Sequence, residues 1–151
     1  MTNNEKLVEA LNDLIKINND RIEGYEKAAR ETDDADLNAV FLKMANQSDD
    51  YKHELNEKIQ DLGGEQATDT TVSGKIYRVW MDIKNTFTGG SRKSVLEVCE
   101  FGEDAAQKAY NEALNSDAEM SAEIRQLIMA QKTDLKKSHD VIKEARDLQK
   151  A

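Results

Sequence analysis

Four stretches of the chain place apolar residues at intervals of three and four, the spacing that puts side chains on one face of an α-helix. They cover residues 7–29, 37–62, 95–113 and 124–145 of the 151 residues. Polar residues interrupt three of these apolar faces at one or two positions, among them Asn18, Ser48 and Gln131. The pattern predicts an all-α protein with four long amphipathic helices.

Capping signals predict where these helices begin and end. A Ser or Thr followed three residues later by Glu forms a capping box at a helix start. Three such pairs precede helical stretches: Thr2 with Glu5, Ser94 with Glu97, and Ser116 with Glu119. An acidic turn at 31–36 separates the first two stretches, and two glycines at 63–64 end the second. The connections between the helices are therefore short, long and short.

The long connection, residues 63–93, holds five of the seven glycines and the only tryptophan. It predicts one domain made of a hairpin (1–62), a crossover (63–93) and a second hairpin (94–151). Two hairpins joined by one long crossover are typical of the ferritin-like antiparallel four-helix bundle. A short helix predicted inside the crossover has an apolar face that we expect to contact the bundle or a protein partner: Ile76, Val79, Trp80 and Ile83.

Composition narrows the classes of function. There is no proline, aromatic residues make up 5%, and the formal net charge is −9. Without a basic cluster, neither nucleic acid nor an anionic membrane surface is an expected partner. One cysteine and the lack of a signal-peptide pattern at the N-terminus indicate a cytoplasmic protein.

Three parts of the sequence resemble a known family. They are Cys99-Glu-Phe-Gly-Glu103 with Tyr110, Arg78-Val-Trp-Met-Asp82 with the glycines at 89–90, and the closing His139-Asp-Val-Ile142. Together they are similar to a bacterial family of ferritin-like four-helix-bundle proteins that form a domain of unknown function. The likeness extends over essentially the whole chain. The resemblance implies a fold and brings no activity with it.

Ferritin-like carboxylate proteins bind two metal ions with inward-facing Glu and Glu-x-x-His residues. No Glu-x-x-His occurs here; the nearest matches are Asp50-x-x-His53 and Lys136-x-x-His139, of which the second puts an ammonium in place of a carboxylate. No cofactor is therefore expected. If iron or another divalent metal binds, the candidate ligands are Asp50, His53, Glu100, Glu103, Asp134 and His139.

In an antiparallel hairpin, two residues at the same height along the helix axes have residue numbers that add up to a constant. With turns centred near 33–34 and 117, four polar residues fall at about one height, and Glu103 is level with Gln131. This predicts a hydrogen-bonded polar layer across the core in place of metal coordination: Asn18, Ser48, Glu103 and Gln131.

Two functions follow from these observations. The first is a non-enzymatic stress-type or structural protein that acts as a homo-oligomer, such as a dimer, or through a protein partner. The alternative is a metal-binding, ferroxidase-like or peroxide-handling enzyme with an atypical ligand set. The incomplete metal motif favours the first.

Overall fold

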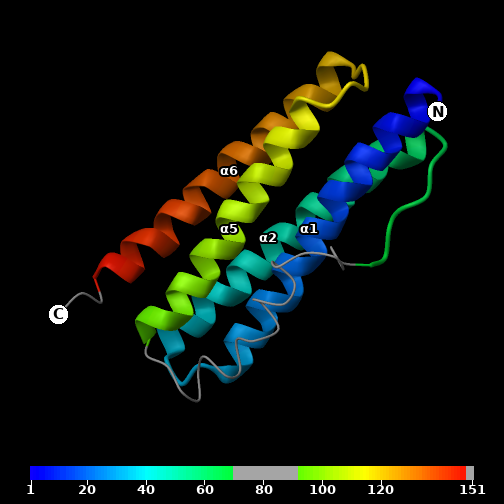
Figure 1. Cartoon of the computed structure of the whole chain (residues 1–151). Coiled ribbons are helices and arrows are strands. Elements are labelled where there is room, and N and C mark those ends of the chain that lie inside the picture. The colour runs from blue at the N-terminus through cyan, green and yellow to red at the C-terminus, as the bar shows by residue number, and fades with distance from the viewer. Residues whose placement is uncertain (70–91, 149–151) are drawn as a thin grey trace.

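The computed structural model describes residues 1–69 and 92–148, and in these ranges the chain forms four long helices and no strand (Figure 1). They are α1 (Asn3–Glu31), α2 (Ala35–Asp61), α5 (Arg92–Leu114) and α6 (Ala122–Asp147). The all-α prediction is confirmed for this part of the chain. None of the described helices has an apolar stretch that would cross a membrane. The predicted partner face (Ile76, Val79, Trp80 and Ile83) lies outside the described residues.

The ends of the first helix pair follow their sequence signals. Thr2 is the N-cap of α1, and its Oγ1 accepts a hydrogen bond from the backbone N–H of Glu5 at 3.2 Å. Residues 32–34 connect α1 to α2. Beyond α2, Gly63 adopts a φ of +79°, a left-handed conformation that glycine accepts without strain. The two predicted glycines therefore do end α2.

The starts of the second helix pair differ from the predicted capping boxes. α5 begins at Arg92, so Ser94 lies inside the helix. The N-cap of α6 is Ser121, whose Oγ accepts from the N–H of Ile124 at 3.2 Å, and Ser116 does not have this role. Ser116 instead extends the end of α5, because its N–H bonds to the carbonyl of Ala113. The turn before α6 is consequently centred later than predicted.

Contacts at both ends tie the first helix pair to the second. The Asn3 side chain donates to the carbonyl of Glu119 at 2.8 Å and accepts from its N–H at 2.7 Å. At the opposite end, Arg92 forms ion pairs with Asp34 at 2.7 Å and Asp36 at 3.1 Å. Along their lengths α1 contacts α2 and α5, and α5 contacts α6, while α2 meets α6 only slightly. The beginning of α1 therefore lies at the α5–α6 turn.

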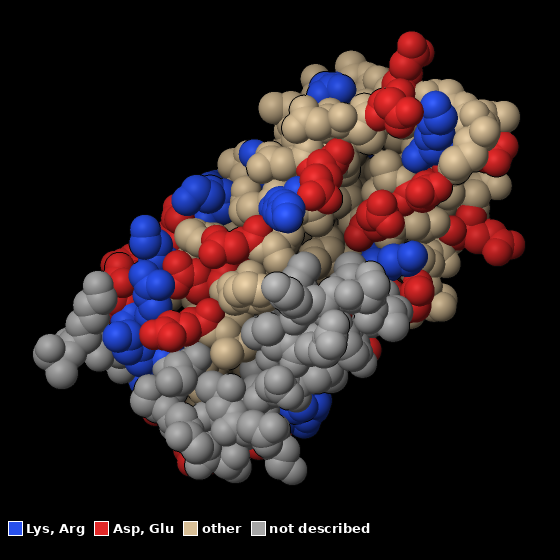
Figure 2. Space-filling view, viewed as in Figure 1, with Lys and Arg blue, Asp and Glu red and all other residues tan. Residues whose placement is uncertain are grey.

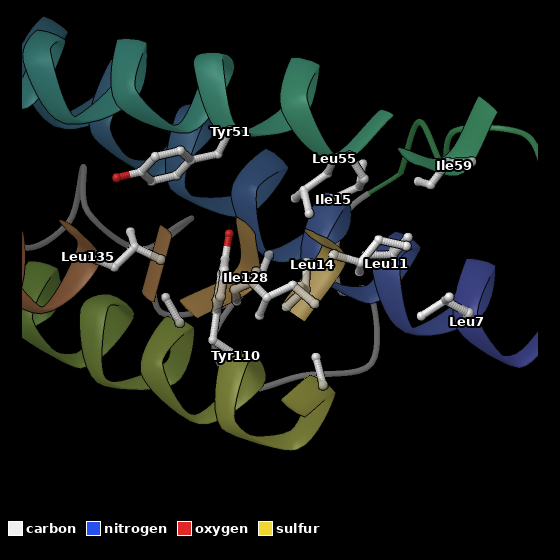
Figure 3. Packing of buried hydrophobic residues seen from close by; sticks show 14 of the residues in the cluster. Leu7, Leu11, Leu14, Ile15, Tyr51, Leu55, Ile59, Tyr110, Ile128 and Leu135 are labelled. Atoms are coloured by element: carbon white, nitrogen blue, oxygen red, sulfur yellow. The ribbon is translucent and has the colours of Figure 1, made fainter. Parts of the chain in front are cut away.

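The core consists of two apolar clusters. Figure 3 shows the larger one, in which side chains such as Leu11, Leu14, Leu55 and Ile128 meet with no exposed surface. The smaller cluster, around Tyr25, Phe41, Leu96, Cys99 and Ile142, lies toward the α1–α2 turn. Most of the buried polar residues fall between these clusters in the sequence of each helix: Asn18 to Arg21, Ser48, Glu103 and Ser138. Gln131 is also buried, between Ile128 and Leu135 of the larger cluster. This polar zone is the most unusual part of the interior.

Candidate functional site

Arg21 of α1 is fully buried in the polar zone and forms an ion pair with Glu103 of α5. Its Nε donates to Oε1 of Glu103 at 2.6 Å, and its Nη2 donates to Oε2 at 3.1 Å. Both side chains have 0% exposure. This is the bidentate geometry in which a guanidinium fits a carboxylate best. A charged pair therefore holds α1 and α5 together inside the bundle.

The same guanidinium also reaches α2. Nη1 of Arg21 donates to Oγ of Ser48 at 2.5 Å, and Nη2 donates to Oε1 of Gln47 at 3.2 Å. Gln47 in turn accepts from the hydroxyl of Ser138 on α6 at 2.9 Å. Arg21 is thus hydrogen-bonded directly to α2 and α5, and through Gln47 to α6. These bonds satisfy buried polar groups that could not reach water.

A second branch of the network runs from Ser48 to α6. Ser48 donates to Oδ1 of Asn18 at 2.8 Å, and Nδ2 of Asn18 donates to the hydroxyl of Tyr110 at 2.9 Å. Tyr110 donates its own proton to Oε1 of Gln131 at 2.6 Å. The amide of Gln131 ends the branch by donating to Oε1 of Glu54 at 3.1 Å. Each hydroxyl in this branch both donates and accepts, so the donor directions are consistent from end to end.

Burial and charge determine the protonation of this region. Burial alone would lower the pKa of Arg21, but the neighbouring Glu103 carboxylate raises it, and the net pKa lies above the ordinary value. Burial raises the pKa of the Tyr25 and Tyr110 hydroxyls and of the Cys99 thiol. The guanidinium also lies 5.3 Å from the centre of the Tyr25 ring, within cation–π range. Arg21 is therefore the fixed positive charge of the core.

The four residues of the predicted polar layer are all buried in this network: Asn18, Ser48, Glu103 and Gln131. Their pairing differs from the prediction, because Glu103 bonds to Arg21 and Gln131 bonds to Tyr110. Arg21 does not belong to the predicted layer, and the apolar pattern predicts its half-buried neighbour Ile22 on the core face instead. The one signal for Arg21 was its spacing, three residues after Asn18 and four before Tyr25, on the same helix face.

The structure does not bring the six candidate metal ligands together. Asp50, His53 and Asp134 are exposed, and His53 interacts with Asp49 on its own helix. Glu103 is occupied by Arg21. Two of the six do meet: Oε1 of Glu100 lies 3.9 Å from Nε2 of His139. The observed contact of His139 with Glu100 lies about one helical turn from the predicted height of His139, which was near Glu97.

Most of the chain matches the model of a known family. No curated protein matches the sequence. A family model described as "Domain of unknown function (DUF2383)" matches residues 6–116, which include α2 and α5 and nearly all of α1. Arg21, Ser48, Glu103 and Tyr110 all fall within the matched range. The chain belongs to the DUF2383 family.

Proposed function

We propose that this protein is a ferritin-like antiparallel bundle that works without catalysis, as a stress-type or structural protein of the cytoplasm. It acts by self-association, as a dimer for example, or by binding a protein partner. The observation that carries the proposal is the buried ion pair of Arg21 and Glu103, which puts a guanidinium in the middle of the core.

The connections and the end contacts support the ferritin-like part of the proposal. Residues 32–34 and 115–121 are short turns, whereas α2 ends at Asp61 and α5 begins only at Arg92. One long crossover between two helix pairs is the ferritin-like topology. Antiparallel packing of α1 and α5 is supported by two contacts: Asn3, at the start of α1, bonds to Glu119 beyond the end of α5, and Arg92, at the start of α5, pairs with Asp34 beyond the end of α1.

The residues of the core do not fit a di-metal centre. Such a centre needs several carboxylates and imidazoles facing inward. Two carboxylates are buried in the described residues, Asp20 and Glu103. Glu103 already pairs with Arg21, and Asn18, Ser48 and Gln131 are neutral. A metal cation beside Glu103 would meet the positive charge of Arg21 at close range in a medium of low dielectric constant, which is strongly unfavourable. Hydrogen bonding takes the place of coordination.

Exposed apolar side chains supply contact area for self-association or a partner. Four of them lie on the described helices: Leu42 is 43% exposed, Phe101 42%, Met129 52% and Val141 48%. Aromatic and methionine side chains are enriched in protein–protein interfaces. They are the surface groups through which a non-catalytic bundle would bind another chain.

Two measurements on the full chain test the proposal. Under aerobic conditions at neutral pH, the protein should oxidise added Fe²⁺ no faster than buffer does, and Glu103→Gln should leave that rate unchanged. Light scattering across a range of concentrations should show association. Iron oxidation that Glu103→Gln abolishes would show that Glu103 takes part in catalysis and would overturn the proposed non-catalytic function. A strict monomer at every concentration would overturn self-association, and the proposal would then rest on a partner of another sequence.

A further inference from the structure

A second polar cluster lies outside the core network, between α5 and α6. Glu100 and Asp104 are four residues apart on α5 and so share a helix face, and His139 lies opposite them on α6. Each residue offers one ligand atom, and the three atoms lie within 4.8 Å of one another. We call Glu100, Asp104 and His139 the seam cluster. It shares no residue with the network around Arg21.

The histidine is oriented from behind by another carboxylate. Nδ1 of His139 lies 3.1 Å from Oδ1 of Asp140, while Nε2 lies 2.7 Å from Oδ1 of Asp104. A hydrogen on Nδ1 that bonds to Asp140 leaves the lone pair of Nε2 directed at carboxylate oxygens. The Nε2 lone pair and the carboxylate oxygens repel each other unless a proton or a metal cation lies between them. Histidines that bind metals are usually held in this way, with the second nitrogen on a carboxylate.

Glu100 and Asp140 each pair with a cationic side chain, and these pairs leave the proposed ligand oxygens available. Nη1 of Arg146 contacts Oε2 of Glu100 at 2.5 Å, so Oε1 remains free to face His139. Lys136 pairs with Asp140 at 2.7 Å. Figure 2 shows acidic and basic side chains intermixed over α5 and α6. Three carboxylates against two cationic side chains leave the surroundings of His139 negative.

Exposure makes the cluster accessible while keeping two of its members partly desolvated. The side chains of Glu100 and His139 are 14% and 13% exposed, whereas that of Asp104 is 63% exposed. A cation can therefore enter from the side of Asp104 and interact with groups in which water screens the charge less.

We propose that the seam cluster binds one divalent transition-metal ion of the Zn²⁺ class through Nε2 of His139, Oε1 of Glu100 and Oδ1 of Asp104. A tetrahedral site with bonds of about 2.0–2.1 Å separates its ligand atoms by about 3.4 Å. The present distances of 2.7 and 3.9 Å from Nε2 lie on either side of that value, so small side-chain rotations close the site. An imidazole beside carboxylates suits Zn²⁺ better than Mg²⁺ or Ca²⁺, which prefer oxygen alone.

Titration of the chelator-treated full chain with Zn²⁺ at pH 7.5, against a chromophoric competitor, tests this proposal. We expect one ion per chain, and we expect His139→Ala and Asp104→Asn each to weaken binding at least about tenfold. The matched control is His53→Ala, which removes the other histidine, 75% exposed and paired with Asp49. It should leave the affinity unchanged. The His139 ring nitrogen resonances should shift on addition of Zn²⁺.

Three results would overturn the site: no saturable binding, binding that survives both seam substitutions, or binding lost equally in His53→Ala. Asp104→Asn gives a decision even if His139→Ala folds poorly, because Asp104 is largely exposed. Zn²⁺ does not change oxidation state, so this titration is independent of the iron-oxidation test. Failure of the seam cluster therefore leaves the proposed non-catalytic function standing, and the reverse also holds.

Discussion

Arg21 and Glu103 contact each other through two parallel hydrogen bonds, 2.6 and 3.1 Å long, with neither side chain exposed. Transfer of both charges from water into the core is costly, and the pair is tolerated because further hydrogen bonds satisfy the guanidinium. Four described hydrogen bonds leave Arg21, two to Glu103 and one each to Ser48 and Gln47. We therefore expect the pair to determine how α1, α2 and α5 fit together more than it adds to the free energy of unfolding.

Removing one member of this pair should be far more harmful than removing both. Arg21→Met leaves the Glu103 carboxylate buried without its partner, so we expect the free energy of unfolding to fall by about 3–5 kcal/mol. The double variant Arg21→Met/Glu103→Leu should recover much of this loss. Urea unfolding of the two single variants and the double variant measures the coupling.

Arg92→Ala is the matched control for Arg21→Met. It removes another arginine with two carboxylate partners, Asp34 and Asp36, but at the surface. Its effect should be small, because exposed ion pairs contribute little. Two results would contradict this prediction: an Arg21→Met variant whose free energy of unfolding falls no more than that of Arg92→Ala, or a double variant no more stable than the single variants.

Alkaline pH should destabilise the protein through its buried tyrosines. Burial raises the pKa of Tyr25, Tyr51 and Tyr110 above the ordinary value of 10. Above about pH 10 the unfolded chain loses these protons while the folded chain keeps them, so the stability present at lower pH decreases. Each such group contributes a slope of up to about 1.4 kcal/mol per pH unit. Urea midpoints between pH 8 and 11 measure the total slope.

Tyr110→Phe separates this effect from other alkaline titrations. The variant loses the hydrogen bonds to Asn18 and Gln131, so it should be less stable at every pH by about 1–3 kcal/mol. Its slope above pH 10 should nevertheless be shallower than that of the parent protein. An unchanged slope would mean that Tyr110 is not protected from ionisation in the folded state.

Cys99 should be unreactive until the bundle opens. The side chain has no exposed surface, and burial raises the pKa of its thiol, which decreases the reactive thiolate. At pH 8 a thiol-specific chromophoric disulfide should react at least about 100-fold more slowly with native than with urea-unfolded protein. Cys99 is the only cysteine, so Cys99→Ala gives the zero-signal control. Rapid native labelling would contradict the described packing.

Gly64 should not tolerate a side chain. A Cβ there would lie 2.6 and 2.8 Å from the two methyl groups of Val8, a β-branched residue that cannot easily rotate away. We expect Gly64→Ala to cost about 1–3 kcal/mol and Val8→Ala to relieve part of that cost. Gly63→Ala is the comparison: it meets no atom within 4 Å, yet its φ of +79° costs about 1 kcal/mol that Val8→Ala cannot restore.

The parts of the fold that follow from local pattern could be predicted from sequence. The Thr2 cap and the glycine stop after α2 depend on neighbouring residues, and both were recognised. Asn18 and Gln131 were recognisable because each is a polar residue in an apolar series. Arg21 was not, because Ile22 completes the same series and the burial of a guanidinium depends on Glu103 far away in the chain.

The seam cluster was predicted only in part, because Glu100 and His139 were among the six candidate ligands and Asp104 was not. The height of residues on α6 was taken from a turn centred near residue 117, whereas the turn runs from the end of α5 at Leu114 to the start of α6 at Ala122. The midpoint of that turn still leaves His139 level with Glu97, whereas its contacts with Glu100 and Asp104 lie about one and two turns farther along α5. The position of the turn alone therefore does not give these contacts. Competing capping signals of the same kind cannot be ranked without knowing which N–H groups are already bonded, such as that of Glu119 to Asn3.

The reciprocal bonds between Asn3 and Glu119 also limit how the two helix pairs can move. They connect the two helix pairs at one end of the bundle, and the ion pairs of Arg92 with Asp34 and Asp36 connect them at the other end. If one helix pair slid past the other by a single turn, about 5.4 Å, the contacts at both ends would break at once. Rotation or spreading of the helices about the long axis would strain them less. Any rearrangement of this protein on binding should therefore widen the bundle sideways and leave its lengthwise register intact.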